Sequence, residues 1–107
     1  MVAAVINFNG KTFLASCLES IFLQTYPVQE ILVVDNGSTD GSMELLRQYP
    51  HPLRILCNEK NLGFAEGANR AIRETESDYL LLLNPDVILS PTFLERLVSF
   101  AEAHPEG

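Results

Sequence analysis

Four apolar runs of this sequence are each followed by polar side chains of the kinds that bind cations, hydroxyl groups and phosphates. The residues at these four positions are Asn7 and Asn9, Asp35 and Asn36, Asn58 and Asn61, and Asn84 and Asp86. Carboxylate oxygens are ligands for Mg²⁺ and Mn²⁺, and side-chain amides donate and accept hydrogen bonds. The amino ends of the same runs carry nothing comparable, so the pattern predicts a ligand site on one side of the fold.

Asp86 is the most informative of these residues. It follows four leucines, and Pro85 already provides a turn at this point. An acid beside a buried strand needs a hydrogen-bonding partner or a cation. Asp35 and Asn36, which follow the second apolar run, have an alternative interpretation. Residues 35–37 (Asp-Asn-Gly) could form a turn without binding any ligand, because these residue types suit turn geometry. Residues 38–40 (Ser-Thr-Asp) fit helix caps better than ligand contacts.

Alternating strands and helices are expected to position these side chains. Continuous apolar runs predict buried strands at 2–8, 30–35 and 78–89, the last with leucines buried on both faces, and an alternating pattern predicts a strand at 52–57. Helices are expected at 12–24, from Asp40 or Gly41 to Pro50, from Gly63 onward, and from a cap at Ser90-Pro91 to His104-Pro105. Helical spacing predicts these core positions: Leu14, Cys17, Leu18, Ile21 and Phe22; Leu45, Leu46 and Tyr49; Phe64, Ala68, Ala71 and Ile72; Leu94, Leu97, Val98 and Ala101.

This element order predicts an α/β fold, a Rossmann-like three-layer αβα arrangement around a parallel sheet. Unbroken apolar strands alternating with amphipathic helices are typical of such a sheet. Right-handed crossovers favour the strand order 3-2-1-4. Ligands bind such sheets outside the carboxyl ends of the strands, where the strand order reverses, and that is where the polar side chains are expected.

Composition narrows the classes of protein and ligand. The chain has 107 residues, enough for one compact domain, and a net charge of −7. That charge argues against nucleic acid, whose backbone needs basic patches, and an anionic small ligand would need a divalent cation between it and the protein. No apolar run is long enough to span a membrane. Cys17 and Cys57 are expected to be buried, reduced thiols, which suits a soluble cytoplasmic protein.

Four segments at fitting spacing carry a resemblance to a known family. VVDNGSTDGS, NEKNLGFAEGANRAI and DYLLLLNPDV resemble successive motifs of the family 2 glycosyltransferases with the GT-A fold, most closely the rhamnosyltransferase-like branch. VINFNGKTFLASCLESI is similar to that family's opening strand and helix, so the resemblance covers essentially the whole chain. It implies transfer of a sugar from a nucleotide-diphosphate donor to an acceptor, usually with inversion.

The resemblance assigns roles at the rim of the sheet. Asn84-Pro85-Asp86 occupies the family's DxD position, which implies that Asp86 coordinates Mg²⁺ or Mn²⁺ bridging the donor diphosphate. Asn84 stands where the family usually has an acid; it can still bind a ribose hydroxyl or a metal-bound water. Asp35 matches the acid that contacts the nucleoside. Phe8 and Asn9 match the loop that packs beside the base.

The third motif is implied to line the donor site through Asn61, Gly63 and Asn69. Two basic residues of the same helix, Arg70 and Arg73, are candidates for a diphosphate contact. The implied donor is a nucleotide-diphosphate sugar, dTDP-rhamnose or a UDP-sugar, and the implied acceptor is a glycan or a lipid-linked molecule. The full-length protein is then expected in the cytoplasm or at the inner face of the membrane.

No catalytic residue is assigned, because an inverting transferase also needs a general base and the family takes it from a later segment. Glu95, Glu102 and Glu106 on the last helix are poor candidates. Residues 1–107 are therefore interpreted as the nucleotide-sugar-binding portion of a domain truncated at its C-terminus. This portion is expected to lack transferase activity, and its exposed sheet is expected to favour self-association.

Other functions fit the sequence less well. An isolated nucleotide-binding module without catalysis stays open as the alternative. A receiver-like signalling domain needs an acidic pair after the first strand, where this chain has Asn7 and Asn9. A sugar-nucleotide pyrophosphorylase needs a glycine-rich basic loop there, and NFNGKTF is not one. No P-loop motif is present.

Overall fold

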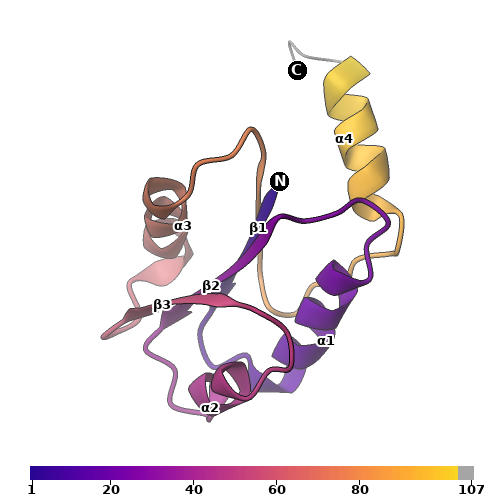
Figure 1. Ribbon diagram of the computed structural model, residues 1–107. Coiled ribbons are helices and arrows are strands. Elements are labelled where there is room, and N and C mark those ends of the chain that lie inside the picture. The colour runs from indigo at the N-terminus through magenta and orange to yellow at the C-terminus, as the bar shows by residue number, and fades with distance from the viewer. Residues whose placement is uncertain (104–107) are drawn as a thin grey trace.

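The computed structural model describes residues 1–103 and shows alternating strands and helices (Figure 1). The elements are β1 (Val2–Asn7), α1 (Lys11–Phe22), β2 (Glu30–Asn36), α2 (Ser42–Arg47), β3 (Arg54–Asn58), α3 (Gly63–Glu74), β4 (Leu80–Leu83) and α4 (Phe93–Ala103). All strand pairs are parallel and the spatial order is β3-β2-β1-β4. The predicted fold class and strand order are confirmed.

The sheet is covered by helices on both faces. Because side chains alternate along a strand, Ala3 and Val5 of β1 face one way and Ala4 and Ile6 the other. The first group packs in a core with α1, α2 and the start of α4, whereas the second packs against α3. Figure 1 shows α3 on one side of the sheet and α1 and α2 on the other. This is the predicted three-layer arrangement.

β4 is much shorter than the predicted strand at 78–89. It spans only Leu80–Leu83, and just Leu83 is fully buried. The chain turns immediately afterwards, where the amide of Val87 donates to the carbonyl oxygen of Asn84 at 3.2 Å. The leucines do pack on both faces, Leu81 and Leu83 in one core and Leu80 and Leu82 in the other. The prediction of full burial was wrong for all but Leu83, and within residues 1–103 β4 has β1 as its one neighbouring strand.

Several predicted core positions on α3 and α4 are exposed instead. Phe64 and Ile72 are 45% and 54% exposed, while Gly67, Ala68 and Ala71 are buried. A Cβ atom at Gly67 would lie 2.6 Å from Cγ2 of Ile6. The small residues thus allow α3 to lie close to the sheet, and its large side chains are displaced to the flanks.

The remaining differences concern element ends and one thiol. α4 begins at Phe93 rather than at Pro91, after a turn in which the amide of Phe93 donates to the carbonyl oxygen of Ser90. On α4, Leu97 is 38% exposed although it was expected in the core. Cys17 is buried as expected, but Cys57 is exposed because β3 is the other edge strand. None of the described helices is long and apolar enough to cross a membrane, and the expected end at His104-Pro105 lies outside the described residues.

Candidate functional site

Strand alternation divides the polar side chains at the carboxyl ends of the strands between the two faces of the sheet. Asn7 and Asp35 are paired in register on β1 and β2, and both face the side covered by α1 and α2. Asn36, one residue later on β2, faces α3 and lines a pocket there with Asn84. The predicted site therefore has two parts, a buried network on the α1 side and a pocket on the α3 side.

The buried network is centred on Asp35, whose side chain is only 2% exposed. Its Oδ1 accepts hydrogen bonds from Nδ2 of Asn7 at 2.9 Å and Oγ of Ser38 at 2.7 Å. Its Oδ2 accepts one from the amide of Ser38 at 2.9 Å. Hydrogen bonds to a carboxylate are the stronger kind, so Asp35 fixes the loop after β2 against the end of β1.

Asn9 joins the same network from the loop after β1. Its amide donates to Oγ of Ser38 at 2.9 Å, and its Oδ1 accepts from the amide of Thr39 at 2.7 Å. Asn9 has φ = 51°, in the left-handed region, which asparagine tolerates better than most residues. Asn9 and Asp35 thus hold two loops of the rim together.

Tight packing connects this network to the turn after β4. Oδ1 of Asn7 is buried and has no hydrogen-bond partner among the described residues. A Cβ atom at Gly10 would lie 2.5 Å from that oxygen and 2.6 Å from Cγ of Pro85. Gly10 is therefore the residue that lets the turn at Pro85 approach Asn7, which is bonded to Asp35.

A pocket of about 220 Å³ lies on the α3 side of the rim. It is lined by Ile6, Phe8, Asn36, Asn61, Gly63, Phe64, Asn84 and Pro85. The phenyl rings of Phe8 and Phe64 are each 45% exposed, and Asn36, Asn61 and Asn84 bring side-chain amides to the same space. Aromatic faces with a few amides suit a planar ligand that carries hydrogen-bonding groups.

A chain of hydrogen bonds fixes one wall of this pocket. Nη1 of Arg70 donates to Oδ1 of Asn58 at 2.6 Å, and Nδ2 of Asn58 donates to Oδ1 of Asn36 at 2.6 Å. Nδ2 of Asn36 then donates to the carbonyl oxygen of Gly63 at 3.1 Å. Arg70 also donates to the carbonyl oxygen of Cys57, so its guanidinium, a candidate diphosphate contact, is held against the end of β3.

Gly63 and Asn61 shape the entrance to α3. Gly63 has φ = 86°, a conformation that other residues adopt only with strain. Its amide donates to Oδ1 of Asn61 at 2.9 Å, which fixes the loop before the helix. Two further residues of α3 lie elsewhere: Asn69 and Arg73 are exposed and do not line the pocket.

Asp86 lies exposed in the turn after β4 and makes no hydrogen bond within residues 1–103. Burial, together with the nearby charge of Asp86, raises the pKa of the Cys17 thiol to about 11, and Sγ of Cys17 lies 3.8 Å from the carbonyl oxygen of Asn84 in the same turn. The described residues contain no cluster of three or more His, Cys, Asp or Glu side chains that could hold a metal. A cation at Asp86 would need oxygens from its ligand, a mode common for Mg²⁺ bound with phosphates.

Of residues 38–40, which were expected to be helix caps, only Asp40 binds helix amides, and it lies one residue before Gly41, the N-cap of α2. Its Oδ2 accepts from the amide of Lys11 at 3.0 Å, and its Oδ1 accepts from the amide of Ser42 at 3.0 Å. One carboxylate therefore serves the first turns of both α1 and α2. Its slight burial works in the opposite direction, but the hydrogen bonds from Ser42 and Lys11 lower the pKa of Asp40 below its usual value.

The pocket brings together four of the predicted residues, namely Phe8, Asn61, Gly63 and Asn84. Asp35 and Asn9 lie in the network behind it, and Asp86 and Asn69 lie outside it. The sequence analysis placed Asn36 among the polar strand ends without assigning it to the donor site, and it missed Phe64 as a pocket residue. Alternation along β2 carries the signal for Asn36, because it must face away from Asp35, whereas Phe64 was assigned to the core.

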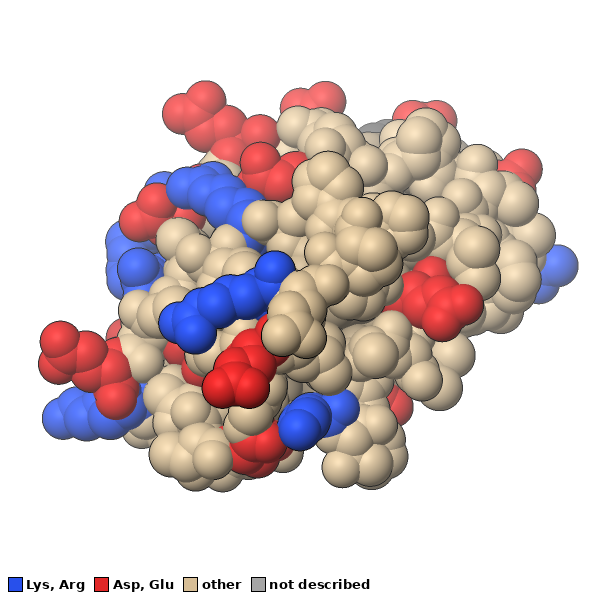
Figure 2. All heavy atoms as spheres, turned by 60° about the horizontal axis from the view of Figure 1, so that its bottom comes forward, with Lys and Arg blue, Asp and Glu red and all other residues tan. Residues whose placement is uncertain are grey.

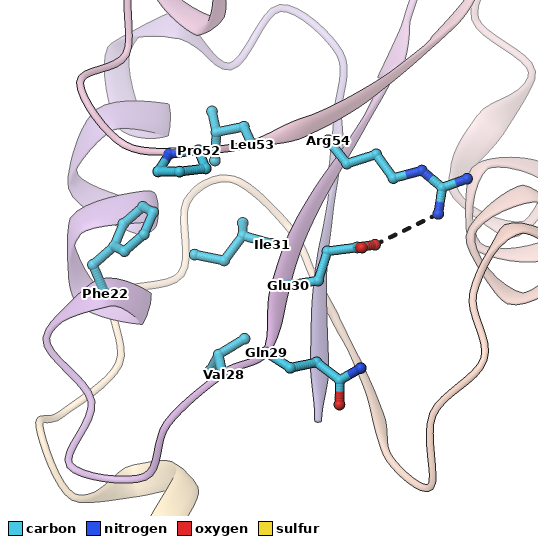
Figure 3. A pocket seen from close by; sticks show the side chains of 8 residues that line it. All are labelled: Phe22, Val28, Gln29, Glu30, Ile31, Pro52, Leu53 and Arg54. Carbon is cyan, nitrogen blue, oxygen red and sulfur yellow. Dashed lines mark ion pairs between the residues drawn. The ribbon is translucent and has the colours of Figure 1, made fainter.

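A larger cavity, of about 440 Å³, lies at the opposite ends of β2 and β3 (Figure 3). Apolar side chains such as Phe22, Ile31 and Leu53 gather on one side of it. Glu30 and Arg54 lie on the other side and pair with each other at 3.5 Å, and Arg54 also pairs with Glu74. Because the guanidinium of Arg54 is already paired with Glu30 and Glu74, this cavity has fewer polar groups free to bind a ligand than the carboxyl ends of the strands. The carboxyl ends therefore remain the candidate site.

Charged side chains of both signs are interspersed on one face of the molecule. On the face shown in Figure 2, Lys and Arg side chains lie beside Asp and Glu side chains and form no continuous basic patch. A nucleic-acid backbone needs such a patch.

Comparisons with known proteins agree on one family. The model of a family described as Glycosyl transferase family 2 matches residues 3–107. The uncharacterized glycosyltransferase YibD of Escherichia coli (strain K12) is 32% identical over 96 residues, covering 88% of this chain and 28% of YibD. TarS 1-349 from S. aureus in complex with UDP-GlcNAc has a TM-score of 0.85 at 24% identity, covering 97% of this chain and 31% of TarS. Mannosyltransferase PcManGT from Pyrobaculum calidifontis, in complex with GDP-Man and Mn²⁺, has a TM-score of 0.74 at 26% identity, covering 81% of this chain and 27% of PcManGT. This chain thus spans less than a third of each of these proteins.

Proposed function

Because this chain belongs to glycosyl transferase family 2, we propose that it is the nucleotide-sugar-binding portion of a metal-assisted, inverting glycosyltransferase. The observation that carries the proposal is the pocket at the carboxyl ends of β1, β2 and β4, with Asp86 just outside it. The pocket lies at the point where the strand order reverses, which is where sheets of this kind bind nucleotides. The rest of the domain would supply the acceptor site and the general base.

We assign different parts of the donor to different residues of the pocket. Phe8 and Phe64 offer aromatic faces to a nucleobase, and Asn36 and Asn61 are placed at the pocket wall beside them. Asn84 lines this pocket two residues before Asp86, a position suited to a ribose hydroxyl or a metal-bound water. Asp35 and Asn9 keep the loops in place, and Asn69 remains a candidate contact for parts of the donor outside the pocket.

Asp86 is the residue we assign to Mg²⁺ or Mn²⁺. Its carboxylate is exposed and free of hydrogen bonds within residues 1–103, so it can bind a cation without first losing a partner. With the donor bound, the cation supplies Lewis-acid stabilisation of the departing diphosphate. This chain's acidic surface, with a net charge of −7, makes such neutralisation necessary.

The donor class is supported by the structural neighbours, which are described with UDP-GlcNAc and with GDP-Man. For this chain we propose a UDP-sugar or dTDP-rhamnose as donor and a glycan or lipid-linked molecule as acceptor. We also propose that the protein works in the cytoplasm or at the inner face of the membrane. Both cysteines are free thiols, which suits a reducing compartment.

Calorimetric titration of UDP and of dTDP, with and without Mn²⁺, tests the proposal. We expect binding of UDP or dTDP that depends on Mn²⁺ and is lost in Asp86→Ala. Phe64→Ala should weaken binding about tenfold, because base–aromatic stacking contributes roughly 1–3 kcal/mol. Ile72→Ala is the matched control, since Ile72 is an exposed apolar residue of the same helix outside the pocket. Equal binding by wild type and Asp86→Ala would remove Asp86 from the site.

A further inference from the structure

Arg70 forms one end of a row of hydrogen-bonded side chains along the wall of the pocket. Its Nη1 donates to Oδ1 of Asn58 and to the carbonyl oxygen of Cys57, each at 2.6 Å. Asn58 donates to Asn36, and Asn36 donates to the carbonyl oxygen of Gly63 at the start of α3. Asn36 and Gly63 line the pocket, whereas Arg70 and Asn58 do not. Arg70 can therefore act on a ligand in the pocket through Asn36 and Gly63.

The two ends of this row fix the direction of its hydrogen bonds. A side-chain amide can turn over and exchange its donor and acceptor groups. A guanidinium only donates, and a backbone carbonyl only accepts. Arg70 at one end and Gly63 at the other thus require the same orientation of both asparagines. Without the guanidinium, Asn58 is free to turn over, and its oxygen would then face the oxygen of Asn36.

Burial makes the orientation of Asn36 important. Asn36 is only 2% exposed, so water cannot readily replace a hydrogen bond that its amide loses. A buried donor or acceptor without a partner is costly, and hydrogen bonds that follow one another in a buried chain strengthen each other. Loss of the contact at Arg70 should therefore loosen the whole wall, including the position of Gly63.

The position of Arg70 argues against a direct contact with the diphosphate. Arg70 is bonded to the end of β3, whereas Asp86, to which we assign the cation, follows β4. Three strand spacings separate β3 from β4, and at about 4.8 Å each they amount to roughly 14 Å. A diphosphate held by a cation at Asp86 is shorter than this gap. Arg70 thus lies on the side of the pocket where the nucleoside is expected.

We propose that Arg70 is a positioning residue for the nucleoside of the donor. Its guanidinium sets the orientation of Asn58 and Asn36 and thereby holds the wall of the pocket in the geometry that receives the nucleoside. This inference rests on the proposed function, since it concerns the same pocket. It gives Arg70 a role that does not depend on the phosphates, so nucleoside mono- and diphosphates should depend on Arg70 equally.

NMR titrations of UMP and UDP, and of dTMP and dTDP, in the presence of Mg²⁺ test this role, because each pair shares a nucleoside and differs in the phosphates. Arg70→Met removes the hydrogen bonds of the guanidinium with little change in side-chain length. It should lower the affinity for both members of a pair by the same factor, about tenfold, as expected for one lost hydrogen bond. Arg73→Met is the matched control, since Arg73 is exposed on the same helix outside the pocket and loses the same charge.

Arg70→Lys tests whether donation by residue 70 is what matters. An ammonium group also only donates, so lysine keeps the orientation of both asparagines and should bind the nucleotides more tightly than Arg70→Met does. A second readout needs no nucleotide. In the free protein the side-chain amide N–H signals of Asn36 and Asn58 should shift in Arg70→Met and stay close to those of wild type in Arg70→Lys and Arg73→Met.

Several results would overturn the positioning role of Arg70. If Arg70→Met weakens only the diphosphates, Arg70 contacts phosphate. If Arg70→Met leaves the affinities or the Asn36 signals unchanged, the wall does not depend on Arg70. If Arg70→Lys binds as weakly as Arg70→Met, or if Arg73→Met has the same effect, donation toward Asn58 is not the cause. Each of these results leaves the proposed function intact, whereas a wild type that binds none of these nucleotides would remove the proposed function together with this inference.

Discussion

Replacing Ser38 with alanine tests whether the network around Asp35 holds the rim together. Oγ of Ser38 donates to Oδ1 of Asp35 at 2.7 Å and accepts from the amide of Asn9 at 2.9 Å and Nδ2 of Asn7 at 3.2 Å. A hydrogen bond to a charged group contributes about 1.5–3 kcal/mol, and a neutral one about 1. The amide of Asn9 is exposed and can bind water instead, so we expect a loss of about 2 kcal/mol in the free energy of unfolding.

Urea denaturation followed by circular dichroism measures this loss. For a chain of this size a slope of about 2 kcal/mol per molar converts the loss into a midpoint shift of about 1 M urea. In a thermal scan the same loss should lower Tm by roughly 8–10 °C. Ser99→Ala is the control, since Ser99 is exposed on α4 and alanine is the better helix former.

A double-mutant cycle with Asp35→Asn identifies the origin of the effect. If Ser38 stabilises the fold through Asp35, the two substitutions should be less than additive by about 1 kcal/mol or more. A Ser38→Ala midpoint within about 0.2 M urea of wild type, beside an unchanged control, would refute the view that this hydroxyl organises the rim.

Three further substitutions or conditions test separate parts of the structure. Gly67→Ala should destabilise the protein by about 1–3 kcal/mol in urea denaturation, because its Cβ would lie 2.6 Å from Cγ2 of Ile6; an unchanged midpoint would contradict the close approach of α3. The lowered pKa of Asp40 means that its contribution to stability is present above its ordinary pKa of 3.8 and is lost as the pH falls below that value. The free energy of unfolding of Asp40→Asn should thus fall less than that of wild type as the pH is lowered through this range. If the two free energies changed with pH in parallel, the Asp40 carboxylate would not stabilise the starts of α1 and α2. At pH 8 iodoacetamide should modify exposed Cys57 and leave Cys17 unmodified, since the pKa of Cys17 is raised to about 11; mass spectrometry should find one adduct per folded chain, and rapid modification of Cys17 would show that its burial is wrong.

The fold could be predicted from sequence because its signals are local and agree with one another. The apolar runs of β1 and β2 and the helical spacing of α1 each point to one element, and connection rules leave few topologies. The predictions of burial that failed concern residues on the two edge strands. Cys57 and the leucines of β4 were expected to be buried, yet within residues 1–103 each lies on a strand with one neighbour, and burial of an edge residue depends on contacts far away in the sequence.

The sequence predicted that polar residues at the strand ends form the site. It did not predict that these residues are divided between the two faces of the sheet. The polar strand ends were evident from residue types, and Phe8, Asn61, Gly63 and Asn84 do line one pocket. Phe64 was placed in the core because helical spacing treats all apolar residues alike. The structure shows instead that Gly67 and Ala71 make the contact with the sheet, which leaves the larger ring free for the pocket.

The side chains of Asn36 and Asn58, in the hydrogen-bonded wall of the pocket, carry no charge. Acidic residues outnumber basic ones two to one in the chain, yet the side chains in that wall are amides tied to a single guanidinium. An anion approaching from this side therefore meets dipoles rather than like charge. An aspartate in place of Asn36 would add a negative charge to the lining of the pocket, so asparagine at this strand end avoids repelling the diphosphate that we propose as part of the ligand.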